Sequence, residues 1–186
     1  MQSVLQNTKS NTIRGISKEL ETKVLPTTGK TIDDFVTQTD KIVGPQPLSE
    51  NLAQIEQRLG NTASGQANPA LVKTVIADLR HRITAGEMPG GMAQGEPYAT
   101  NLLKMNDARK YLNESLNSWF KSGAPVGTKT NDLNSLRWEA SNELKNMLAE
   151  ADTTNSAFKR ALDVQHNALA AKNVLANKAL VGANDT

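Results

Sequence analysis

Cysteine is absent from this sequence of 186 residues, and aromatic residues are scarce, with two Trp, two Tyr and three Phe. The absence of cysteine excludes disulfide frameworks, thiolate metal sites and thiol nucleophiles. Two histidines are too few to hold zinc without help from carboxylates. We therefore expect no metal, no cofactor and no catalytic residues, and a protein that is not an enzyme.

A large charge excess and long apolar runs are also missing. Lys and Arg number 21 against 19 Asp and Glu, which gives a net charge of +2. No apolar run approaches the roughly 18 residues that a membrane-spanning helix needs, and residues 1–10 lack the apolar segment of a signal peptide. We expect no membrane span and a cytosolic or particle-enclosed location.

The apolar content predicts a thin core. Leu, Ile, Val and Phe make up 40 of the 186 residues, just above the roughly 20% below which chains tend toward disorder. The length fits one domain. A thin core beside many polar helix faces favours assembly with other protein subunits or as a homo-oligomer.

Apolar residues recur at helical spacing in most of the chain. The clearest stripe runs from Leu71 to Ile83 and follows Asn68 and Pro69, which suit a cap and a first helical position. No segment alternates with a period of two, so no sheet is expected. The sequence predicts an all-α fold, an antiparallel bundle of about five to six helices. Beside residues 69–85, we expect helices over 31–43, 48–59, 100–120, 130–151 and from 156 onward.

Proline and glycine mark the predicted boundaries between these helices. Pro26 and Gly29 predict a linker over Leu25–Lys30, which separates a polar N-terminal extension with a weak helix (1–30) from a helical bundle domain (31–186). Thr31 is expected to cap the next helix, and Gly60–Asn61 to stop the one after it. Thr130 or Asn131 is expected to cap the helix that ends near residue 151.

A long loop rich in Gly and Pro is expected from Gly86 to Pro97. Because connections in helical bundles are usually only about 2 to 8 residues long, it is either a mobile excursion or a binding loop. Met88 and Met92 within it either fold back on the bundle or contact a partner.

Basic residues near the end of the third predicted helix form the main candidate for phosphate contact. Arg80, His81 and Arg82 are adjacent and lie off the buried stripe, so the simplest interpretation is a solvated basic turn. The functional alternative is contact with a nucleic-acid backbone, to which other cations would contribute. The candidate set is Arg80, His81, Arg82, Lys104, Arg109 and Lys110.

Trp138 is the main aromatic candidate for partner contact. It lies two residues from Leu136 and from Ala140, so it points away from their stripe. It is either an exposed anchor for a partner or the cover of a second interface within the bundle. Glu139 and Glu143 are interpreted as solvated charges on the wet face of the same helix. Asp33–Asp34 are interpreted as acidic residues of a first helical turn.

Four segments in the C-terminal part of the chain share a pattern: DARKYL at 107–112, DLNSLR at 132–137, NSAFKRA at 155–161 and ALVG at 179–182. They resemble helical segments of large phage and prophage proteins. In those proteins a glycine-containing turn leads to a leucine-arginine helix, an aromatic-x-x-alanine helix and an alanine-leucine-x-glycine ending. The resemblance covers rather under half of the chain and implies a structural or interaction module of a virion-associated or internal protein delivered with the genome.

These observations lead to two functional hypotheses of different classes. The first is a non-enzymatic structural and interaction module of a phage or prophage virion-associated protein, found in the virion or the host cytoplasm, whose partners are other protein subunits. The alternative is a small nucleic-acid-binding protein that uses a mildly basic helix face. A third interpretation places an enzyme site in the Gly86–Pro97 loop, and no catalytic set supports it.

Overall fold

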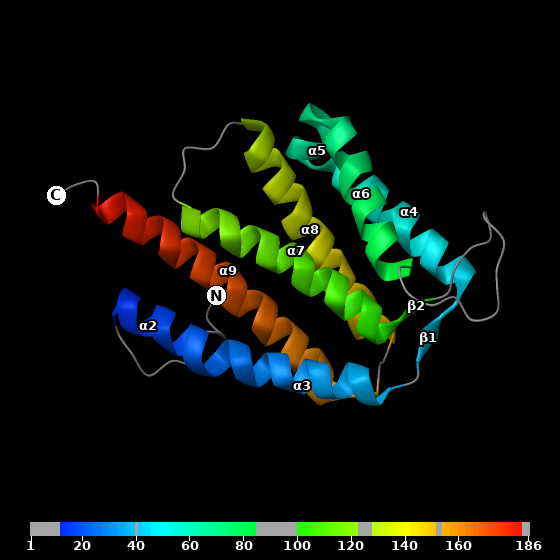
Figure 1. The fold of residues 1–186 in the computed structure, drawn as a ribbon, viewed down its shortest axis with the longest axis horizontal. Helices are drawn as coiled ribbons and strands as arrows, with labels where there is room; N and C mark the ends of the chain where they lie inside the picture. Colours follow the sequence, from blue (N-terminus) through cyan, green and yellow to red (C-terminus); the bar gives the residue numbers. More distant parts are fainter. Residues whose placement is uncertain (1–11, 40, 85–99, 123–127, 152–153, 184–186) are drawn as a thin grey trace. The chain divides into compact units, whose positions relative to one another are not determined.

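The computed structural model describes residues 12–39, 41–84, 100–122, 128–151 and 154–183 (Figure 1). These residues are almost entirely helical, which confirms the all-α fold class. They group into two compact units, with residues 12–38, 117–122 and 154–183 in unit 1 and residues 39, 41–84, 100–116 and 128–151 in unit 2. The bundle arrangement of the whole chain stays a prediction. The expected loop at Gly86–Pro97, with Met88 and Met92, lies outside the described residues.

Unit 1 begins with one continuous helical rod. Helix α2 (Ile13–Glu19), the π-helical turn η1 (Leu20–Val24) and α3 (Leu25–Gln38) follow one another without a break. Thr12 caps the start, because its side chain accepts a hydrogen bond from the backbone N–H of Gly15. The helix then passes through the segment that was predicted to interrupt it.

The predicted linker at Leu25–Lys30 is therefore wrong. Proline lacks a backbone N–H, and its ring crowds the carbonyl four residues back. For Pro26 that carbonyl lies within η1, where the wider i→i+5 turn makes room for the disturbance. The Thr31 hydroxyl donates to the Thr27 carbonyl inside α3 instead of capping a new helix. Residue 30, the predicted domain boundary, falls inside α3, and the whole rod belongs to unit 1.

The π turn also keeps one face of the rod pointing inward. Side chains that are buried or half-buried recur every four residues, at positions 16, 20, 24, 28, 32 and 36. In a regular α-helix with 3.6 residues per turn, each such step rotates the stripe by about 40°. A turn that takes up more residues reduces this rotation, so residues before and after η1 face the same neighbour.

That neighbour is α9 (Ser156–Ala183), which runs antiparallel to the rod (Figure 1). At one end the rings of Phe35 and Phe158 lie 4.1 Å apart between centroids. Toward the other end, Lys172 pairs with Glu21 at 2.9 Å. Leu20 and Ala168 are buried in the contact between the rod and α9, and Ile16, Val24, Leu25, Ala171 and Leu175 pack against them.

Unit 2 is arranged around α8 (Thr128–Ala151). It packs against α4 (Pro45–Asn61), α5 (Ala63–Ala67) and α6 (Pro69–Thr84). Arg58 of α4 donates a hydrogen bond to Glu143 of α8. This bond, with the negative charge of Glu143, raises the pKa of Arg58 above its ordinary value. Glu143 is thus largely covered and paired, and its interpretation as a solvated charge is wrong.

Helix α7 (Leu102–Ser122) contributes buried polar groups to unit 2 through its residues up to 116. Asn101 caps its start by accepting from the backbone N–H of Lys104. Farther along, the hydroxyl of Ser141 on α8 donates to Asn113 of α7 at 2.8 Å. Because both groups are buried, this bond fixes which turns of the two helices face each other.

A tight connection between α4 and α6 was missed by the sequence analysis. Thr62 ends α4 and caps the five-residue α5, its hydroxyl accepting from the Gly65 N–H. A Cβ on Gly65 would lie 1.9 Å from the carbonyl oxygen of Leu59, so only glycine allows this approach. The side-chain amide of Asn68 then donates to Asp132 of α8.

Several predicted helix ends are wrong by a few residues. The helix expected over 31–43 ends at Gln38, and β1 (Ile42–Val43) pairs antiparallel with β2 (Thr100–Asn101). Both residues of β1 are β-branched and suit a strand once a partner is near. Asp33–Asp34 lie well inside α3 and not in a first turn. Gly60–Asn61 still belong to α4, and α8 begins at Thr128, before either expected cap.

None of the helices described is long and apolar enough to cross a membrane.

Leu20 provides a test of the packing between the rod and α9 in unit 1. Its side chain is fully buried against α9, so Leu20→Ala should lower the free energy of unfolding by about 2–5 kcal/mol through lost burial and a residual cavity. Ile13 on the same rod is 52% exposed, and Ile13→Ala should change stability by less than about 0.5 kcal/mol. Urea denaturation followed by circular dichroism measures both, and equal effects would contradict the packing described.

Candidate functional site

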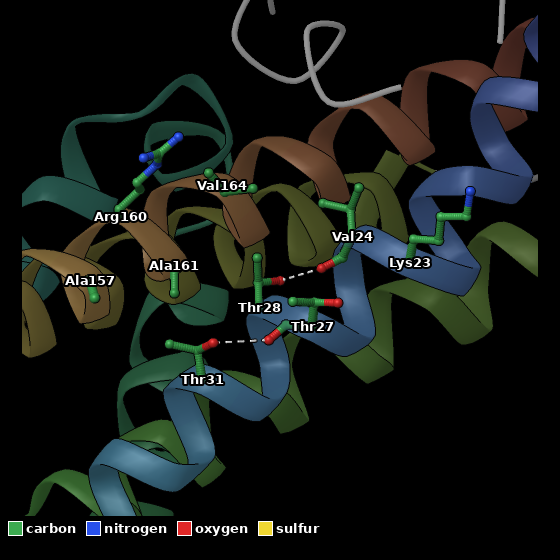
Figure 2. Close-up of a pocket in the computed structure, with 9 residues that line it drawn as sticks. All are labelled: Lys23, Val24, Thr27, Thr28, Thr31, Ala157, Arg160, Ala161 and Val164. Atoms are coloured by element: carbon green, nitrogen blue, oxygen red, sulfur yellow. Dashed lines mark hydrogen bonds between the residues drawn. The ribbon is translucent and has the colours of Figure 1, made fainter. Parts of the chain in front are cut away.

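A groove lies along the antiparallel pair formed by the rod and α9 in unit 1 (Figure 2). One wall comes from η1 and α3 and the other from α9, and the space between them measures about 430 Å³. Its lining is mainly apolar and its side chains are small, apart from two cations. The lining residues are Lys23, Val24, Thr27, Thr28 and Thr31 on one wall and Ala157, Arg160, Ala161 and Val164 on the other.

Two of the three threonines of the groove direct their hydroxyl groups to their own helix. Thr28 donates to the Val24 carbonyl at 2.8 Å, and Thr31 donates to the Thr27 carbonyl at 3.1 Å (Figure 2). Such back-bonding is usual for threonine within a helix. Because these two hydroxyls are already satisfied, the wall that carries them behaves as an apolar surface.

Two cations flank this surface, one on each wall (Figure 2). The side chain of Lys23 is 71% exposed, and its ammonium forms a long ion pair of 3.7 Å with the half-buried Glu19. Arg160 is exposed and has no ion-pair partner within the described part of the chain. Among the described residues no carboxylate lines the groove, so these residues make its walls mainly apolar and its rim positive.

A second groove, in unit 2, contains part of the predicted phosphate-contact set. It lies along α4 and α6 and measures about 450 Å³. Arg80 and His81 are exposed on α6 and line this groove together with Lys73, but Glu56 of α4 faces the same space. The structure therefore brings together two of the six predicted residues, adds one cation that the prediction lacked, and sets a carboxylate beside them.

The other four predicted phosphate contacts do not line this groove. Arg82 pairs with Asp78 at 3.0 Å, and its guanidinium lies 3.1 Å from the centre of the Tyr111 ring. Arg109 is only 1% exposed and donates two hydrogen bonds to Asn106, so the prediction that it contacts phosphate is wrong. It lies on the buried face of α7, one turn from Leu112. Lys104 and Lys110 are half-buried on the same helix.

Trp138, the predicted partner contact, is half-buried on α8 and interacts with the rest of the chain. Its predicted role as an anchor stays a prediction. No group of three histidine, aspartate or glutamate side chains that could hold a metal ion occurs in the described ranges.

Comparison with protein families, with curated proteins and with solved structures finds no match for this chain. Its function must therefore be argued from its own residues.

The unit 1 groove was not predicted from the sequence, because Pro26 predicted a break in the helix that forms one of its walls. Thr27 and Thr31 are four residues apart, as are Ala157 and Ala161. On continuous helices this spacing places each pair on one face. Two faces of small residues, each beside a cation, were the available signal.

The burial of Arg109 leads to a second prediction. Arg109→Ala should lower the free energy of unfolding by about 1–3 kcal/mol, because buried Asn106 loses both hydrogen bonds that Arg109 donates. Arg80→Ala, at an exposed position, should stay within about 0.5 kcal/mol of the parent protein. Thermal and urea denaturation measure the difference. A stable Arg109→Ala variant with weakened nucleic-acid binding would restore the contact role.

Proposed function

We propose that this chain is a non-enzymatic structural and interaction module of a phage or prophage virion-associated protein, which assembles with other protein subunits. The observation that carries the proposal is the unit 1 groove between the rod and α9, whose walls carry small, mainly apolar side chains and whose rim carries two cations. The free energy of the system falls when a partner removes an apolar surface of this kind from water. The assignment to a phage particle rests on the resemblance of residues 107–182 to helical segments of virion-associated proteins.

The chemistry of the groove supports packing in preference to catalysis. Small-molecule sites usually combine apolar walls with a few polar groups that converge on the ligand. Here the hydroxyls of Thr28 and Thr31 are bonded to their own backbone, and the two charges lie on different helices. A protein segment that covers the walls fits these features.

Recovery from purified particles tests the proposal. If the chain is a virion component, quantitative mass spectrometry of particles from the source organism, induced where a prophage is present, should recover its peptides in a fixed ratio to the other virion proteins. Soluble extract of the same cells is the control. Peptides found only in that extract, and never in particles, would contradict the assignment.

A second function, nucleic-acid binding, is favoured by the unit 2 groove. Lys73, Arg80 and His81 lie on one face of α6, where a phosphate backbone can reach them. Glu56 in the same groove opposes the approach of an anion, which makes this the weaker of the two proposals.

Salt dependence tests this alternative. Affinity for a single-stranded oligonucleotide should fall with salt, and the slope of log K against log salt should decrease by roughly 0.7 for each phosphate contact removed. Lys73→Gln and Arg80→Gln together should therefore flatten the slope, whereas Arg14→Gln, at an exposed site in unit 1, should not. Absence of binding at low salt would exclude the function.

A further inference from the structure

We propose that the unit 1 groove binds an amphipathic α-helix of a partner protein, with aliphatic side chains along its inner face and carboxylates beside them. The inference rests on the proposed interaction function and adds the chemistry of the partner. Three properties of the groove support it: its dimensions, its mainly apolar walls, and its charge.

The dimensions of the groove match a helix. On one wall, residues 23–31 rise about 12 Å along the helix axis at 1.5 Å per residue, or about two turns. Amphipathic helices that bind in grooves use anchors at i, i+3 or i+4, and i+7, which span the same two turns. Thr27 and Thr31 on this wall, with Ala157 and Ala161 on the other, are small enough for a third helix to approach closely.

The walls offer little to a polar ligand. The hydroxyls of Thr28 and Thr31 are bonded to backbone carbonyls of their own helix, and the remaining wall residues include Val24, Ala161 and Val164. Along Val24, Ala161 and Val164 a neutral polar molecule such as a sugar would lose hydrogen bonds to water without replacing them. Aliphatic side chains lose none, so they are the favoured occupants of the walls.

The charge of the groove selects among apolar helices. Lys23 and Arg160 are exposed, one on each wall, and none of the lining residues that the structure describes is a carboxylate. A helix with glutamates on both sides of its apolar stripe is complementary to both cations, whereas one with lysines is repelled. These contacts are exposed, so they contribute orientation and partner choice and are weakened by salt.

Two synthetic helical peptides test the proposal on the full chain. Both carry the same leucine and alanine stripe, flanked by glutamates in one peptide and by lysines in the other. Titration is followed by NMR of protein labelled at the methyl groups of Ala, Val and Thr. The glutamate peptide should shift the signals of Val24, Thr27, Thr31, Ala157 and Val164, and bind about tenfold more tightly than the lysine peptide at low salt.

Matched variants separate filling of the groove from loss of its charge. Ala157→Trp, at an exposed position on the wall, should abolish binding of the glutamate peptide, whereas Ala53→Trp, on the exposed face of α4, should not. Lys23→Glu with Arg160→Glu should reverse the preference in favour of the lysine peptide. Arg14→Glu, exposed and outside the groove, is the charge control and should leave the preference unchanged.

Three results would overturn the inference. They are no binding of the glutamate peptide, shifts confined to methyl groups outside the groove, and equal binding of both peptides. Sedimentation of the free protein adds a fourth: a dimer that Ala157→Trp converts to monomer would show that a second copy occupies the groove.

The same variants distinguish this inference from the proposed function. One outcome is that the chain is recovered in particles, that the Ala157→Trp variant is recovered equally well, and that the purified chain does not bind the peptide. This outcome would retain the virion role and reject the groove as the docking site. Peptide binding that Ala157→Trp abolishes, in a chain absent from particles, would retain the groove and reject the virion role.

Discussion

The packing of α9 against the continuous rod of α2, η1 and α3 is the constraint on which unit 1 depends. The two segments are far apart in the sequence, and each supplies the apolar cover that the other lacks. Leu20 and Ala168 belong to one buried cluster between the rod and α9, while the rings of Phe35 and Phe158 hold one end of this contact. The π turn keeps Leu20 and Ile32 on the same side of the rod although Pro26 lies between them. With the inward face used for α9, the neighbouring face of Thr27 and Thr31 becomes a wall of the groove.

Unit 2 depends more on buried polar groups. Asn113 and Ser141 are bonded across α7 and α8, and Arg109 is held inside by Asn106. Groups of this kind cost free energy when they are buried without partners, so they disfavour arrangements in which the helices slide past one another. The arrangement also withdraws Arg109 from the surface, and Arg82 is paired with Asp78. Two of the cations that suggested a basic face therefore serve the fold.

The sequence predicted helices well where one stripe determined the burial and poorly where a distant partner did. Leu71–Ile83 and the helix from Ser156 were found because their apolar residues repeat with the helical period. Pro26 wrongly predicted a linker, because the rule that proline interrupts a helix considers only the local chain and not the packing energy that α9 supplies. Ile42–Val43 form a strand only because residues 100–101 pair with them, and Gly65 was missed because its close contact is with the Leu59 carbonyl.

The candidate sites show the same division. Exposure of Arg80 and His81 could be predicted from a stripe, but the burial of Arg109 depends on which face of α7 the other helices cover. The groove needed two helices in register, which no local pattern reveals.

Between the two grooves, charge decides the favoured partner. The unit 2 groove combines cations with Glu56, so a phosphate backbone is both attracted and repelled there. Among the described residues, the charges that line the unit 1 groove are both positive and its walls are mainly apolar, so a ligand that is both aliphatic and acidic matches both properties.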